Sequence, residues 1–281
     1  MQQEVNEFLD YLAKRGRKEI TIQNYRTKLS VCMRLLEEGG FDTSAEKIDE
    51  AAVFYLRKSL CMKEESAHCY LKVIGYFTEW KTKTDILKQC DLLWNNPQIH
   101  RLFLDDEKFM RLLSAADARE KVILMLGGYM GLRRAEISNV RYSDIQDGYL
   151  IVRGKGHGDG KEAHLRIPPV VIDAINQWTA VRRKYEDRSD GRIVVSYQSH
   201  TLKQISLPAI SHIVRDLGKR AGVKATTHSL RRYFATSLYE KKVDISDIKT
   251  LMRHENVNTT INCYINPNAN RLDEIMENIG H

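Results

Sequence analysis

The sequence predicts a mainly α-helical protein with one small antiparallel β-sheet, an α+β chain of two domains. Apolar residues recur at helical spacing through most of its 281 residues, whereas the stretch 91–104 contains Asn95-Asn96-Pro97 and shows little periodicity. Two β-like runs flank a glycine-rich loop at 154–160. A chain of this length can bury two hydrophobic cores. We therefore expect a helical domain at 1–90, a linker at 91–104 and a larger domain at 105–281.

The first domain is predicted to be a small bundle of helices joined by short turns. Along its second helix, apolar residues lie three, four and seven positions apart; Thr21 can cap this helix, and Gly39-Gly40 can end it. The predicted helices cover residues 8–15, 21–38, 51–60 and 66 to about 81.

The second domain is predicted to begin with two helices, at 106–116 and 119 to about 130. The second of these is strongly apolar and so is expected at the centre of the core. The runs Tyr149–Arg153 and His164–Pro168, joined by the glycine-rich loop, predict a β-hairpin. Further helices are expected at 169–184, 206–221, 229–241 and 245–252.

Composition excludes some classes of protein and favours others. No stretch approaches the ~20 apolar residues of a membrane-spanning helix, and the N-terminus lacks a secretory signal, so we expect a cytoplasmic protein. The five cysteines form no metal-binding motif, which predicts that they are reduced thiols rather than metal ligands. Through Leu104 the chain has 16 basic against 15 acidic residues, and the remainder has 28 against 22. This basic excess suits a polyanionic partner.

Two local features in the second domain have both an ordinary and a functional interpretation. Arg133 and Glu136 lie one turn apart and could form a surface ion pair. However, Arg133 follows a segment expected to be buried, where a guanidinium needs a partner with several oxygens. Lys155, in Gly154-Lys155-Gly156, is either a solvated turn residue or an ammonium brought to a site by a loop; Lys161 is the alternative candidate.

Two more features lie toward the C-terminus. His228 and Arg231 would project from the same face at the start of a helix, an arrangement that can bind phosphate, although the pattern also arises by chance. His254 and Tyr264 are ordinary residues when considered separately, because a tyrosine near a chain end usually packs its ring and exposes its hydroxyl.

Taken together and in this order, the four features resemble the tyrosine recombinase family, the phage-integrase and Xer-like site-specific recombinases. The first domain, with Thr21–Tyr25 in its second helix, is similar to the family's core-binding (SAM-like) DNA-binding domain. The matching motifs are GLRxxE at Gly131–Glu136, GKG at Gly154–Gly156, HxLR at His228–Arg231, and His254 followed by Thr259-Thr260 and Tyr264.

The resemblance implies a catalytic set with Tyr264 as the nucleophile. The other members are Arg133, Lys155, His228, Arg231 and His254. This chain departs from the family at two points. Arg253 stands where the family usually has glycine, and Tyr264 follows His254 by ten residues where the family usually has nine. In a helix, one extra residue would rotate the tyrosine by about 100°. Either a looped segment absorbs the extra residue or Tyr264 is presented differently.

The implied reaction is phosphoryl transfer on double-stranded DNA without a cofactor. Tyr264 attacks a backbone phosphate, forms a 3′-phosphotyrosyl link and releases a 5′-hydroxyl, and the reverse attack rejoins strands. Arg133 and Arg231 would bind phosphate oxygens, His228 would accept the tyrosine proton and Lys155 would protonate the leaving oxygen. His254 would hydrogen-bond a phosphate oxygen, and Glu136 would anchor the region around Arg133.

The resemblance also implies partners and leaves alternatives open. Family members work as tetramers on paired sites, in some cases with accessory DNA-bending proteins, and their two domains close on DNA as a C-shaped clamp. The apolar stripe Leu272, Ile275, Met276 and Ile279 could pack in its own subunit or on a neighbour. A type IB topoisomerase-like enzyme and a catalytically decayed DNA-binding regulator are the alternatives. The target sequence and the choice between integration, excision and dimer resolution are not predicted.

Overall fold

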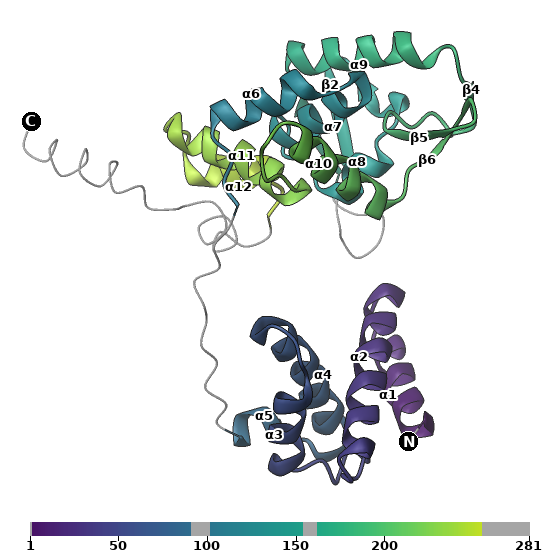
Figure 1. Ribbon diagram of the computed structural model, residues 1–281, viewed down its shortest axis with the longest axis vertical. Coiled ribbons are helices and arrows are strands. Elements are labelled where there is room, and N and C mark those ends of the chain that lie inside the picture. The colour runs from purple at the N-terminus through teal and green to yellow at the C-terminus, as the bar shows by residue number, and fades with distance from the viewer. Residues whose placement is uncertain (1, 91–101, 154–161, 255–281) are drawn as a thin grey trace, which may run out of the picture. The chain divides into compact units, whose positions relative to one another are not determined.

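The computed structural model describes residues 2–90, 102–153 and 162–254 (Figure 1). The chain divides into two compact units, Met1–Gln98 and Ile99–His281, here called the N-terminal and C-terminal units. The boundary falls within the segment 91–104 that the sequence analysis assigns to a linker. Helices predominate in both units, and the predicted fold class, mainly α with a small antiparallel sheet, is confirmed.

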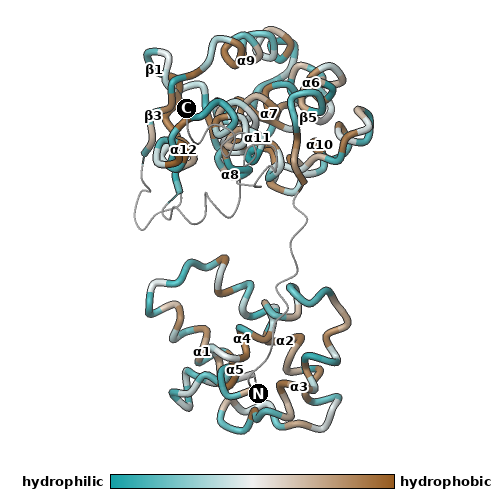
Figure 2. Tube along the Cα trace, turned by 90° about the vertical axis from the view of Figure 1, so that its left-hand side faces the viewer, coloured by the Kyte–Doolittle hydropathy of each residue, from teal (hydrophilic) through white to brown (hydrophobic). Residues whose placement is uncertain are grey.

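Every regular element among the described residues of the N-terminal unit is a helix. Its core contains Phe8, Leu29, Leu56 and Phe77, and the rings of Phe8 and Phe77 meet edge to face with centroids 5.5 Å apart. Hydrophobic and hydrophilic residues alternate along the helices, as expected for a bundle with one buried face (Figure 2). The helices are α1 (Gln2–Lys14), α2 (Glu19–Glu38), α3 (Glu50–Ser59), α4 (Glu64–Thr82) and the single turn α5 (Ile86–Gln89).

The starts of α1 and α2 and the presence of α5 differ from the prediction, and α1 begins at Gln2, six residues before its predicted start. The N-cap of α2 is Lys18, which makes no side-chain capping bond, so the helix begins before Thr21. Asp85 caps α5 by accepting a hydrogen bond from the backbone N–H of Leu87 at 3.1 Å. A helix of one turn is too short to show a periodic pattern, which is why the sequence did not reveal it.

The C-terminal unit is built around one apolar helix, α7 (Ala118–Gly128). As predicted, Val122, Ile123, Leu124 and Leu126 of this helix are buried. It contacts helices before and after it in sequence, and Figure 1 shows it inside the unit. The helices packed around it are α6 (Asp106–Ala115), α8 (Arg134–Asn139), α9 (Pro169–Arg182), α10 (Leu207–Arg220) and α11 (Thr227–Glu240), and α12 (Ile245–Leu251) packs on α11.

The predicted hairpin is present as part of a three-stranded antiparallel sheet. The strands β1 (Ile145–Gln146), β2 (Tyr149–Arg153) and β3 (Glu162–Arg166) lie in that order. At the loop end of the hairpin Arg153 pairs with Glu162, and the loop that carries Lys155 lies outside the described residues. The second strand of the hairpin, β3, starts and ends two residues earlier than the predicted run His164–Pro168.

A second sheet, with no counterpart among the predicted elements, lies in the same unit. It consists of β4 (Glu186–Asp187), β5 (Val195–Gln198) and β6 (Thr201–Gln204) in the order β4-β6-β5, with β4 parallel to β6. Ser199 and His200 connect β5 to β6 with φ angles of 48° and 65°. Two-residue hairpin turns with positive φ usually contain glycine or asparagine, so this turn lacks the usual sequence signal.

Among the residues described, no helix is both long and apolar enough to cross a membrane.

Candidate active site

A tight turn between α7 and α8 places Arg133. Gly131 has a φ of 61°, and the backbone N–H of Leu132 donates to the carbonyl of Leu126 at 2.9 Å. Arg133 is the N-cap of α8, and the Glu136 carboxylate reaches back to accept the backbone N–H of Arg133 at 2.7 Å. This local geometry holds Arg133 and Glu136 together at the helix start.

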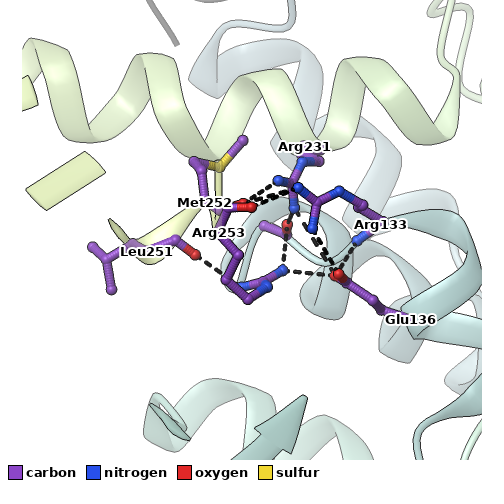
Figure 3. Close-up of polar contacts among 7 residues, drawn as sticks. Arg133, Glu136, Arg231, Leu251, Met252 and Arg253 are labelled. Atoms are coloured by element: carbon purple, nitrogen blue, oxygen red, sulfur yellow. Dashed lines mark hydrogen bonds and ion pairs between the residues drawn. The ribbon is translucent and has the colours of Figure 1, made fainter. Parts of the chain in front are cut away.

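Glu136 is the shared partner of three guanidinium groups, which with it form what we call the arginine cluster (Arg133, Arg231, Arg253 and Glu136; Figure 3). Its carboxylate oxygens lie 2.8 Å from Arg133 Nη1, 2.7 Å from Arg253 Nη2 and 4.0 Å from Arg231 Nη1. The Glu136 side chain is only 5% exposed, so the pair with Arg133 is not a surface ion pair. Burial raises the pKa of Glu136, but Arg253 and Arg133 outweigh it and the net pKa is lowered.

Besides their contacts with Glu136, the guanidinium groups of Arg231 and Arg133 donate hydrogen bonds to backbone carbonyls. Arg231 donates to the carbonyls of Gly131 and Met252, and Arg133 donates to the carbonyl of Arg253 at 2.8 Å (Figure 3). The Arg231 side chain is 5% exposed and that of Arg133 is 33% exposed. Two permanently charged forks are therefore fixed by the protein beside one another, which is the arrangement needed to bind an anion with several oxygens.

The turn after α12 supplies two of these carbonyls. The N–H of Arg253 donates to the carbonyl of Thr250 at 2.9 Å, and the N–H of His254 donates to that of Lys249 at 3.1 Å. This is a Schellman motif, whose left-handed position is usually glycine; here it is Arg253, with a φ of 53°. In the sequence, Arg253 stands out only as a departure from the family pattern. An arginine where glycine is usual was the only sequence signal of its place in the cluster.

Two histidines lie close to the arginines. His228 is on the first turn of α11, three residues before Arg231, and partial desolvation together with the charges of Arg232, Arg134 and Arg231 lowers its pKa. Burial lowers the pKa of His254 to about 4, with Arg231, Arg133 and Arg253 acting in the same direction. Both imidazoles are therefore neutral at pH 7, so each has one nitrogen that can accept a proton.

The structure thus brings together four of the predicted site residues, Arg133, His228, Arg231 and His254. They come from the turn before α8, the first turns of α11 and the turn after α12. Lys155, its alternative Lys161, and Tyr264 lie outside the described residues. Within the ranges 2–90, 102–153 and 162–254, no group of three or more His, Cys, Asp or Glu residues could hold a metal ion.

Replacing Gly131 by alanine is expected to lower the free energy of unfolding by about 2–4 kcal/mol. A Cβ there would lie against the ring of Phe234 and 3.1 Å from the Met252 sulfur, and φ is positive. Gly191→Ala is the matched control, because Gly191 has a φ of 69° and nothing within 4 Å of the added atom. It should cost only the backbone strain, about 1 kcal/mol. Urea denaturation measures both, and equal losses would contradict the steric account.

The lowered pKa of His254 predicts a stability that depends on pH. The unfolded histidine has a pKa near 6.5, so between pH 6.5 and about 4 the unfolded chain binds a proton that the folded chain excludes. The free energy of unfolding should therefore fall as the pH is lowered through this range. We therefore compare how far the free energy of unfolding falls between pH 7 and pH 4.5 in the two proteins. After allowance for the partial exposure of the ring, we expect this fall to be about 1–2 kcal/mol smaller in His254→Gln than in the wild type. Parallel urea titrations of the two proteins test this, and identical pH profiles would refute it.

Comparisons with known proteins agree on one family. A sequence model described as the Phage integrase family matches residues 101–271. The chain is 28% identical over 285 residues to the tyrosine recombinase XerA of Pyrococcus furiosus. This alignment covers 97% of this chain and 92% of that protein.

Two solved structures share the fold. A lambda integrase (75–356) dimer bound to a COC′ core site has a TM-score of 0.77 at 18% identity and covers 95% of this chain and 96% of that one. A lambda integrase tetramer bound to a Holliday junction has a TM-score of 0.74 at 19% identity, over 94% and 77% of the two chains.

Proposed function

The chain belongs to the phage integrase family of tyrosine recombinases, and from this premise we propose that it is a site-specific DNA recombinase. It cuts and rejoins DNA strands through a 3′-phosphotyrosyl intermediate formed on Tyr264, and it uses neither a metal ion nor ATP. The observation that carries the proposal is the pair of guanidinium forks, Arg133 and Arg231, that converge on the carbonyls of the turn after α12.

The chemistry that these arginines perform follows from the charge of the substrate. A phosphodiester repels nucleophiles, and during transfer negative charge spreads over its non-bridging oxygens. Fixed cations directed at those oxygens stabilise the transition state more than the ground state. Arg231 and Arg133 are held by Glu136 and by backbone carbonyls before substrate arrives, so little reorganisation accompanies the reaction.

The proton transfers are assigned to His228 and Lys155, and His254 is assigned a hydrogen bond to the phosphate. The hydroxyl of Tyr264 has an ordinary pKa near 10, so only about one in a thousand is ionised at pH 7. Neutral His228 accepts this proton as the tyrosine oxygen attacks phosphorus. Lys155 protonates the departing 5′-oxygen, and neutral His254 donates one hydrogen bond to a phosphate oxygen.

DNA and further copies of this chain are the proposed partners. The lambda integrase structures that share its fold are described as bound to a core site and to a Holliday junction, the latter as a tetramer. We propose that residues 1–90 form the core-binding domain and 105–281 the catalytic domain of a C-shaped clamp, and that the protein acts as a tetramer on paired sites in the cytoplasm. The basic excess of the second part of the chain makes binding strongly dependent on salt.

The first experiment captures the covalent intermediate and identifies its DNA. The protein is incubated in excess EDTA with fragments of its source DNA, the mixture is denatured, and DNA that stays joined to protein is sequenced from the cleaved end. A tyrosine recombinase yields one short target with the protein on a 3′ phosphate. An absolute need for Mg²⁺ would instead indicate a metal-dependent nuclease.

The second experiment separates recombination from the alternatives. Two duplexes that carry the mapped target and different labels are mixed with the protein. Recombination produces duplexes that carry one arm from each parent. A type IB topoisomerase-like enzyme relaxes a supercoiled plasmid without exchanging arms, and a decayed DNA-binding regulator binds the target but forms no adduct.

A further inference from the structure

We propose that Arg253 is a positioning residue for strand cleavage, because it holds the turn after α12 so that two of its carbonyls orient the guanidinium groups of Arg231 and Arg133. The inference rests on the proposed function and adds a residue that its chemistry does not use directly. Arg253 acts through Glu136 and the backbone, without contact to the reacting atoms.

The backbone at Arg253 has the conformation of a glycine position. The Schellman bonds from Arg253 to Thr250 and from His254 to Lys249 require a left-handed residue, and Arg253 adopts it with a φ of 53°. Glycine would adopt this conformation without strain. A side chain kept here at a cost in strain therefore needs a compensating role.

The side chain makes contacts that no glycine could supply. Nη1 donates to the carbonyl of Leu251 at 2.8 Å, and Nη2 donates to Glu136 Oε2 at 2.7 Å and to the carbonyl of Gly131 at 3.2 Å (Figure 3). The side chain is only 9% exposed. Arg253 thus joins the turn after α12 to the turn before α8, through Gly131, and to α8 itself, through Glu136, which is 117 residues earlier in the chain.

Both arginines proposed to bind the phosphate donate to backbone carbonyls whose positions depend on the Arg253 side chain. Arg231 donates to Met252 and Gly131, and Arg133 donates to the main chain of Arg253 itself. Two of these three carbonyls lie in the turn that the Arg253 side chain anchors, and the third accepts a bond from it directly. Loss of the side chain would leave the turn to its local Schellman bonds and let the acceptors rotate relative to Glu136.

The test compares Arg253→Met, Arg253→Gly and Arg253→Lys with the wild type. Single-turnover cleavage of a nicked duplex carrying the mapped target is measured at saturating protein, and DNA affinity is measured separately. We expect cleavage by the Met and Gly variants to be slower by about 10- to 100-fold, with DNA affinity within about twofold of wild type. Lys, which can reach Glu136 with one charged donor, should recover at least part of the rate.

The Gly variant separates positioning from stability, since it removes the backbone strain together with the side-chain contacts. Arg182→Met is the matched control: the Arg182 side chain is 5% exposed and pairs with Asp187 at 2.6 Å, but it contacts the main chain of Arg192 and not the arginine cluster. It should melt at a lower temperature and cleave at the wild-type rate when assayed below that temperature. Wild-type cleavage by Arg253→Gly and Arg253→Met would overturn the proposal, as would a matching loss of DNA affinity.

A double substitution tests whether Arg253 acts through Glu136. If it does, Arg253→Met should slow cleavage much less in a Glu136→Gln background than in the wild type, because the shared contact is already weakened. If the fold-losses in cleavage rate of the two single variants instead multiply in the double variant, Arg253 acts independently of Glu136 and this account is refuted. A wild-type protein that forms no adduct would instead refute the proposed function, so the two failures are distinguishable.

Discussion

Tyr264→Phe is expected to abolish the covalent protein–DNA adduct while DNA affinity stays within about twofold of the wild type. The change removes one oxygen atom, which is the proposed nucleophile, and keeps the ring. Loss of a nucleophile costs on the order of 10⁵-fold or more in rate, which places residual cleavage below detection. The measurement is adduct formation on the nicked target duplex after denaturation, with binding followed by electrophoretic mobility shift.

The matched control for this substitution is Tyr197→Phe. Tyr197 lies on β5 and is 46% exposed, and we expect the variant to form adduct at the wild-type rate. Tyr264 is the only tyrosine that follows His254 in the chain. An adduct that persists in Tyr264→Phe would therefore refute the assignment of the nucleophile. A Tyr264-dependent adduct would show that ten residues after His254 is a functional spacing.

Arg231→Lys is expected to slow single-turnover cleavage by about 10³-fold, although the charge is kept. The planar guanidinium of Arg231 is bound by the carbonyls of Gly131 and Met252 on two of its nitrogens and lies beside Glu136. A lysine ammonium has no fixed fork with which to satisfy both carbonyls and still face a phosphate in a defined orientation. DNA affinity should fall less than about fivefold, because many other phosphate contacts support binding.

The control for this prediction is Arg182→Lys, since the Arg182 side chain is buried to the same degree. It should leave the cleavage rate unchanged at a temperature below its melting point. Cleavage by Arg231→Lys within tenfold of the wild type would contradict the proposed electrostatic role, since charge alone would then suffice without the fork.

The helical part of the fold was predictable because it depends on local patterns. The apolar run of α7 marked the centre of the C-terminal unit, and amphipathic spacing revealed the long helices of the N-terminal unit. The misses are short elements, among them α8 with six residues and α5, β5 and β6 with four each. Elements of this length are stabilised by the contacts around them, which a single sequence does not reveal.

The residues of the candidate site were likewise predictable only in part. The order of the motifs was enough to choose Arg133, His228, Arg231 and His254, and the structure brings these four together. Lys155 and Tyr264 stay predictions. Arg253 was missed as a member because its partners, Glu136 in α8 and the carbonyl of Gly131 in the turn before it, lie more than 100 residues earlier in the chain. No local pattern encodes such a contact.

The carbonyl acceptors of the arginine cluster have a consequence for mutational scanning. Met252 and Arg253 hold Arg231 and Arg133 through main-chain oxygens, which every amino acid possesses. An alanine scan would therefore report only the side-chain packing of Met252 and would be blind to its hydrogen bond. Replacing the amide between residues 252 and 253 with an ester, by semisynthesis, would weaken that oxygen as an acceptor and would also remove the Arg253 N–H that donates to Thr250, while every side chain stays in place.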